Sequence, residues 1–144
     1  EQMKRLDAIL ARRDQVARWY MDRLRDEPRV SMQKISGDCR ISWFVFVIKL
    51  DDKYSEQDRG TIIAALRERG IGCSNYFSPI HLQPFYRERF GFKPGDFPVT
   101  ERAGETCLAL PFFGRMREEQ VDEVCGALGE ILERAPTTAR RALA

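Results

Sequence analysis

The sequence has few of the residues from which self-contained catalytic or metal sites are built. It contains a single histidine, His81, and ten scattered glycines, so no glycine-rich loop is present to hold a phosphate. Its four cysteines lie far apart, without the close spacing of a zinc site or a redox motif. They are Cys39, Cys73, Cys107 and Cys125. We therefore expect free thiols, no bound metal and no nucleophile–base pair within this chain.

Excess charge and long hydrophobic runs are lacking as well. Lys plus Arg total 24 against 22 for Asp plus Glu, a net charge of +2 that is too small to favour nucleic acid or an anionic membrane. The longest apolar run, Trp43–Ile48, is too short to cross a bilayer, and no secretory signal opens the chain. With 43% hydrophobic residues, the composition predicts one globular domain, which we expect to be cytoplasmic.

The first half of the sequence predicts a helix followed by two strands. Apolar residues recur at helical spacing from Met3 to Arg25, and the charges between them indicate a solvated face. The β-branched and aromatic run Ile41–Leu50 predicts a strand covered on both faces, hence a central one. The alternating segment Val30–Ile35 is its expected partner, and Gly37-Asp38 supplies the turn between them.

The second half adds helices and shorter strands. Ser55 and Asp58 have the spacing of a capping box before a helix that ends near Gly70. An extended segment over 71–77, an irregular segment over 79–98, a short helix over 100–104, a strand over 107–110 and a helix around 121–132 follow. The predicted fold class is α+β, with helices packed on a small, mostly antiparallel sheet. One domain spans 1–135, and 136–144 is expected to be a frayed tail.

The carboxylates lie on predicted helix surfaces at salt-bridge spacing, so we interpret them as solvating. One segment stands out, since Ser74–Tyr86 concentrates Asn, Tyr, His and Gln between aromatic residues as it leaves a strand. Loops held by a rigid sheet are where ligand contacts gather. Composition alone leaves the alternative open that His81 is a buried structural residue and that the aromatics fill the core.

The motifs in this half resemble a known family. The strings PIHLQPFY and LALPFF, the Pro-Gly-Asp loop before Phe97, and the EEQVDEV helix occur in the order found in DegT/DnrJ/StrS-type aminotransferases. The opening EQMKRLDAILARRDQVARWY is similar to the helix that connects the two domains of these enzymes. The resemblance covers about Glu1 to Arg134. One departure is Arg117, where the family often has Thr or Ser as the N-cap of the final helix.

The resemblance implies the C-terminal small domain of a fold-type-I enzyme that uses pyridoxal phosphate, with residues 1–25 as the connecting helix. In this family the Schiff-base lysine belongs to a large N-terminal domain, and no lysine here lies in a comparable motif. It follows that pyridoxal phosphate is expected in the complete enzyme and not on this chain alone, which is predicted to be inactive. Implied partners are the large domain, a second copy in a homodimer and a nucleotide-sugar substrate.

The resemblance also implies that His81 lies near that substrate, with Asn75 and Tyr76 as further candidates. The predicted function is to close the substrate cleft of an enzyme that transfers an amino group to a keto nucleotide-sugar. The alternative is a free-standing α+β module that binds a ligand or regulates without catalysis. An RNA-binding sheet is disfavoured because the central strand lacks an exposed aromatic and basic pattern.

Overall fold

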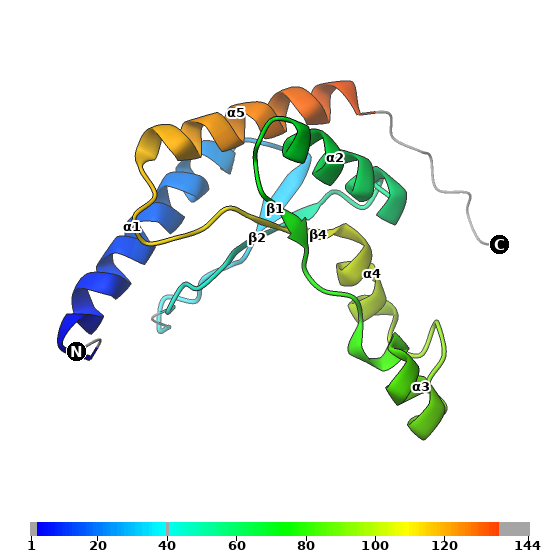
Figure 1. Cartoon of the computed structure of the whole chain (residues 1–144). Helices are drawn as coiled ribbons and strands as arrows, with labels where there is room; N and C mark the ends of the chain where they lie inside the picture. The colour runs from blue at the N-terminus through cyan, green and yellow to red at the C-terminus, as the bar shows by residue number, and fades with distance from the viewer. Residues whose placement is uncertain (1–2, 40, 136–144) are drawn as a thin grey trace.

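A computed structural model describes residues 3–39 and 41–135 (Figure 1). The predicted tail at 136–144 lies outside the described residues. Two short 3₁₀ turns, Met3–Arg5 and Ile80–Leu82, accompany the regular elements. These are α1 (Leu6–Leu24), β1 (Val30–Met32), β2 (Phe46–Leu50), α2 (Glu56–Glu68), β3 (Ser74–Asn75), α3 (Pro84–Phe90), α4 (Pro98–Thr106), β4 (Cys107–Leu110) and α5 (Glu118–Arg134).

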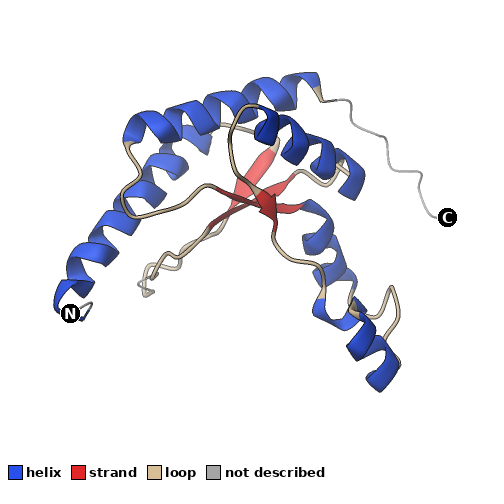
Figure 2. Ribbon diagram, in the orientation of Figure 1, coloured by secondary structure: helices blue, strands red, loops and turns tan. Residues whose placement is uncertain are grey.

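The four strands form one antiparallel sheet in the order β1-β2-β4-β3 (Figure 2). The predicted α+β class is confirmed, and β2 lies at the centre between β1 and β4. Along β2 the side chains alternate between buried and half-buried, so one face of the sheet is sealed and the other is partly open. The prediction of a strand covered on both faces is therefore only half right.

Three long helices cover the sealed face. Figure 1 shows α1, α2 and α5 along the same side of the sheet, and α5 packs against both of the others. The ring of Tyr20 on α1 stacks on Phe46 of β2 at 4.7 Å between centroids. This layer holds the hydrophobic core, because the 3.6-residue period of each helix turns one apolar stripe towards the sheet. Its fully buried large side chains include Tyr20, Tyr54, Phe46, Ile48, Leu50, Ile62, Leu66, Leu108 and Leu128.

Helix α1 is buried over only part of its apolar stripe. Val16, Tyr20 and Leu24 lie in the core, whereas Met3 is 78% exposed and Leu6 is 40% exposed. Figure 1 shows the N-terminal half of α1 running beyond the body of the domain. The stripe read from the sequence is therefore longer than the sheet that it covers, and its first part is left bare.

The strands are shorter than predicted. The run from Ile41 gives a strand only from Phe46, which pairs with Leu110. The next pair would place Val45 opposite Pro111, and proline has no N–H to donate to a ladder, so the pairing stops there. Trp43 is nevertheless buried against Phe46 at 5.7 Å between ring centroids. The hydrophobic character of Trp43 therefore reflects its packing in the core, not a place in a strand.

The expectation of an irregular segment over 79–98 is wrong, because it contains a 3₁₀ turn and the helix α3. Pro84 begins α3, and Pro98 begins α4 two residues before the predicted short helix. A proline is compatible with the first helical turn, where its missing N–H has no partner to lose. Gly91, at φ 73°, ends α3 in the left-handed conformation that glycine adopts at least cost. The prolines and glycine mark helix ends here.

The predicted capping box of α2 is confirmed. The Ser55 hydroxyl accepts from the backbone N–H of Asp58, and the Asp58 carboxylate accepts from the backbone N–H of Ser55 at 2.8 Å. At the start of α5 the Arg117 side chain supplies no cap. Instead, the side-chain oxygen of Gln120 accepts the Arg117 backbone N–H at 3.0 Å, which fixes the first turn.

Within the described residues, no helix is long and apolar enough to cross a membrane. No group of three or more His, Cys, Asp or Glu side chains there has a geometry that would hold a metal ion. The four thiols are free, with Cys39 exposed and Cys73 buried. Burial raises the pKa of the Cys73 thiol, which keeps it protonated and unreactive.

Candidate functional site

The segment Ser74–Gln83 leaves the edge strand β3 and lies against α4. A Cβ atom on Gly104 would come within 2.8 Å of Pro79 Cδ and 3.2 Å of the Phe77 carbonyl oxygen, so a side chain there would displace the segment. The buried guanidinium of Arg59, from α2, donates to the Gly104 carbonyl oxygen beneath this contact. The glycine therefore lets the segment approach the backbone of α4 closely.

His81 lies at the centre of a polar junction within this segment. Its Nε2 is 2.9 Å from Oε1 of Glu101, which comes from α4. The same carboxylate accepts the backbone N–H groups of Gly95, at 2.9 Å, and Phe97, at 3.2 Å. The Gly95 N–H, followed by the His81 side chain, holds the pKa of the Glu101 carboxyl below its ordinary value. One carboxylate thus ties the 3₁₀ turn to the loop that joins α3 and α4.

The ring of His81 is enclosed but keeps one nitrogen available. The residue is only 8% exposed, and Phe92 and Phe97 meet its ring edge-on at 6.2 and 4.8 Å between centroids. Nδ1 has no hydrogen-bond partner among the described residues. The one buried side-chain nitrogen or oxygen without a partner in that part of the chain is Arg59 Nε. Nδ1 is therefore open to the surface.

A carboxylate at Nε2 favours the tautomer that carries its proton there. Nδ1 of the neutral ring then accepts a hydrogen bond, as from a hydroxyl group.

The other two predicted site residues lie nearer the sheet edge. Asn75 is exposed on β3, where it pairs with Leu108, and Tyr76 is half-buried. The Tyr76 ring stacks on Phe77 at 4.3 Å between centroids. No hydrogen bond or ring contact joins either residue to His81 in the part of the chain that the structure describes. The structure thus brings His81 together with Glu101, Phe92 and Phe97 rather than with Asn75 and Tyr76.

Sequence reasoning missed Glu101 because it interpreted the carboxylates as solvating side chains. That interpretation is wrong for Glu101, which accepts three hydrogen bonds, from His81, Gly95 and Phe97. The neighbouring Arg102 also has a structural role, because its guanidinium donates to the backbone carbonyl oxygens of Asp52, at 2.5 Å, and Tyr54, at 3.0 Å. The sequence did contain one indication of this role. Glu101 lies in the first helical turn after Pro98, where the helix dipole favours a carboxylate.

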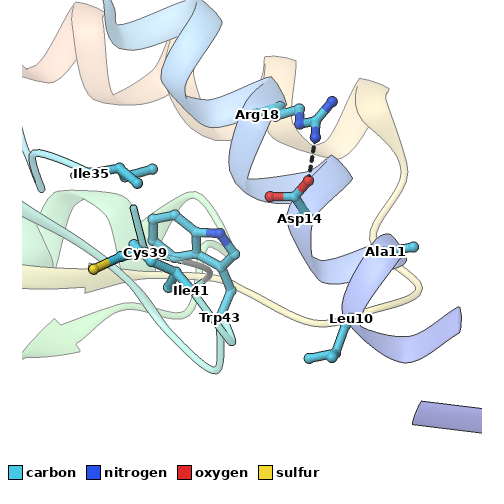
Figure 3. A pocket seen from close by; sticks show the side chains of 8 residues that line it. All are labelled: Leu10, Ala11, Asp14, Arg18, Ile35, Cys39, Ile41 and Trp43. Atoms are coloured by element: carbon cyan, nitrogen blue, oxygen red, sulfur yellow. Dashed lines mark hydrogen bonds and ion pairs between the residues drawn. The ribbon is translucent and has the colours of Figure 1, made fainter. Parts of the chain in front are cut away.

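A hollow of about 410 Å³ lies elsewhere, between α1 and the segment that joins β1 and β2 (Figure 3). One wall is formed by α1, where Arg18 pairs with Asp14 at 2.5 Å. Trp43, Ile35 and the exposed Cys39 form the other wall. The ion pair makes one side of the hollow polar, and no residue of the Ser74–Gln83 segment lines it.

Comparison with known proteins points to one family. The sequence profile of the DegT/DnrJ/EryC1/StrS aminotransferase family matches residues 1–129. The spore coat polysaccharide biosynthesis protein SpsC of Bacillus subtilis is 33% identical over 135 residues, which are 93% of this chain and 35% of SpsC.

Solved structures share the fold. DesV of S. venezuelae, determined in complex with a ketimine intermediate, has a TM-score of 0.81 at 25% identity, covering 93% of this chain and 34% of DesV. The sugar aminotransferase Spr1654 of Streptococcus pneumoniae, described as putative and solved in its PLP form, has a TM-score of 0.87. It is 21% identical, over 94% of this chain and 34% of its own, and so supports the fold alone. The chain thus spans about a third of the length of these proteins.

Proposed function

The chain belongs to the DegT/DnrJ/EryC1/StrS aminotransferase family, and we propose that it is the C-terminal small domain of a pyridoxal-phosphate-dependent enzyme. That enzyme transfers an amino group to a keto nucleotide-sugar, and this domain closes the substrate cleft. The observation that carries the proposal is the coverage: 93% of this chain matches only about a third of SpsC and of DesV.

In this proposal residues 1–135 form the small domain, and residues 1–25 form the helix that connects it to a large N-terminal domain. The bare apolar half of α1, with Met3 and Leu6 exposed, supports such a partner. Exposed apolar stripes of this kind mark surfaces that are covered in an assembly. The complete enzyme is expected to be a cytoplasmic homodimer.

The residues present do not fit a Schiff-base site for pyridoxal phosphate. Such a site needs a lysine amine held in a cleft. Lys49 is half-buried on β2 and is paired with Asp52 at 2.9 Å, while the other four lysines are exposed. These are Lys4, Lys34, Lys53 and Lys93. The lysine that the family uses therefore has to come from outside this chain.

In this proposal, this chain supplies residues that bind the substrate in the cleft. His81 is proposed to contact the nucleotide-sugar through Nδ1, while Nε2 is held by Glu101. Asn75 and Tyr76 add polar groups along the same segment. A hydroxyl group of the sugar can donate a hydrogen bond to Nδ1 in the tautomer that carries its proton at Nε2.

The cofactor test compares the 144-residue chain with a longer polypeptide that includes the preceding region. Each is mixed with an equal amount of pyridoxal phosphate, reduced with borohydride and weighed by intact mass spectrometry. The longer protein should gain one pyridoxyl group, and the chain alone should gain none. The variant Lys49→Arg is the matched control, since it removes the one half-buried lysine. Stoichiometric labelling of a single lysine in this chain, lost in that variant, would contradict the proposal.

The substrate contact is tested in the complete enzyme with His81→Ala. Loss of one hydrogen bond should raise the KM for the keto nucleotide-sugar about fivefold. The melting temperature is measured on the same protein, because the buried ring also packs against Phe92 and Phe97. An unchanged KM together with a lower melting temperature would mean that His81 has a structural role only.

A further inference from the structure

The part of the chain between the second 3₁₀ turn and α4 lies apart from the hydrophobic core. We refer to residues 84–97, which comprise α3 and the connection from α3 to α4, as the α3 lobe. Figure 1 shows α3 at the far end of α4, away from the layer formed by α1, α2 and α5. No residue of α3 is buried, and Phe85 and Phe90 are each more than half exposed. The core therefore does not hold the lobe in place.

Few hydrogen bonds join the α3 lobe to the rest of the domain. At its two ends the bonds are local, since the Gln83 carbonyl oxygen accepts from Arg87 and the Phe97 carbonyl oxygen accepts from Glu101. Apart from such local bonds, the hydrogen bonds between the lobe and the rest of the described chain all go to the carboxylate of Glu101. This carboxylate accepts the Gly95 N–H at 2.9 Å and the Phe97 N–H at 3.2 Å. One side chain of α4 thus holds the loop of the lobe.

The same carboxylate holds the ring of His81. Oε1 of Glu101 lies 2.9 Å from Nε2, and the Glu101 side chain is only 18% exposed, so little water competes for it. The ring in turn meets Phe92 and Phe97 of the lobe edge-on. Without this carboxylate, one ring nitrogen and two backbone N–H groups would lose their acceptor together.

We propose that Glu101 is a positioning residue, which fixes the His81 ring and the α3 lobe relative to each other. With Nε2 held, the ring does not turn over to exchange its two nitrogens, and Nδ1 keeps one direction. Hydrogen bonds to a carboxylate are charge-assisted and stronger than neutral ones, which suits a single side chain to this task. A substrate contact at Nδ1 rests on the proposed function, whereas the fixing of ring and lobe does not.

The first experiment uses NMR on the 144-residue chain labelled with ¹⁵N, in which His81 is the only histidine. An imidazole N–H gives a signal in a ¹H–¹⁵N spectrum when a hydrogen bond slows its exchange with water. We expect one ring N–H signal, from Nε2, and slow exchange of the backbone N–H groups of Gly95 and Phe97. Glu101→Ala should remove the ring signal and speed the exchange of both backbone groups about tenfold or more, because each loses a bond to a charged acceptor.

The matched control is Glu88→Ala, which removes an exposed carboxylate from the lobe itself. It should leave the ring signal and both backbone exchange rates unchanged. Glu101→Gln keeps an acceptor oxygen without the charge, so its effect should be intermediate, and it carries the test if Glu101→Ala does not fold. A ring signal from Nδ1, no ring signal in the unchanged chain, unchanged exchange in the folded Glu101 variants, or equal effects in the control would overturn the proposal.

The second experiment measures the KM for the keto nucleotide-sugar in the complete enzyme. Glu101→Ala should raise the KM about fivefold with kcat unchanged, as expected for His81→Ala. Because Glu101 acts through His81, the double variant should be no worse than either single variant, whereas independent effects would multiply to about 25-fold. Multiplied effects would overturn the positioning role. If His81→Ala leaves the KM unchanged while Glu101 still controls the ring signal, the substrate contact fails and the positioning role is supported.

Discussion

Gly104 allows a direct test of how the candidate segment is seated. Replacing a glycine inside a helix by alanine normally stabilises the helix by about 1 kcal/mol, because alanine has less backbone entropy to lose. At Gly104 the new methyl group would lie 2.8 and 2.9 Å from two atoms of the Pro79 ring and 3.2 Å from the Phe77 carbonyl oxygen. Overpacking of this kind costs about 1–3 kcal/mol. Gly104→Ala is therefore expected to lower the free energy of unfolding, by about 1 kcal/mol after the helix gain is subtracted.

The matched control is Gly126→Ala, in the interior of α5. Gly126 is exposed, and a Cβ atom there meets nothing within 4 Å. This variant should gain most of the helix stabilisation, about 0.5–1 kcal/mol. Urea unfolding followed by circular dichroism gives both values, and each kcal/mol corresponds to about 2–4 °C in the melting temperature of a domain of this size. If Gly104→Ala is as stable as Gly126→Ala, the close approach of Pro79 to α4 is wrong.

Two further predictions concern hydrogen bonds that span the chain. The buried Tyr20 hydroxyl donates to the Pro111 carbonyl oxygen at 2.7 Å, so Tyr20→Phe should cost about 1 kcal/mol in urea unfolding; an unchanged midpoint would argue against this bond. The lowered pKa of Glu101 means that its stabilisation is present above the ordinary value of 4.5 and is lost as the pH falls through the lowered value. Between about pH 7 and about pH 3, the free energy of unfolding should therefore fall less for Glu101→Gln than for the unchanged chain. Equal falls in the two proteins would refute this assignment.

Local patterns in the sequence were sufficient for several elements. The 3.6-residue period of apolar side chains located α1 and α5, because a helix buries one stripe whatever it packs against. Ser55 and Asp58 predicted their capping box because both partners lie within one helical turn. The family resemblance likewise depends on contiguous motifs, and the profile match over residues 1–129 agrees with it.

Contacts between distant residues were decided only by the tertiary structure. His81 and Glu101 are 20 positions apart, and no periodicity relates a 3₁₀ turn to the first turn of a later helix. The strand from Phe46 stops where its partner reaches Pro111, a limit set by register rather than by the hydrophobic run itself. In the same way, the positive charge of Arg5, Arg12 and Arg115 resembles that of any solvated helix or loop in sequence. These side chains come to line one hollow only when the β4–α5 connection folds back beside α1, because a charge takes its surroundings from the whole fold and not from its neighbours in the chain.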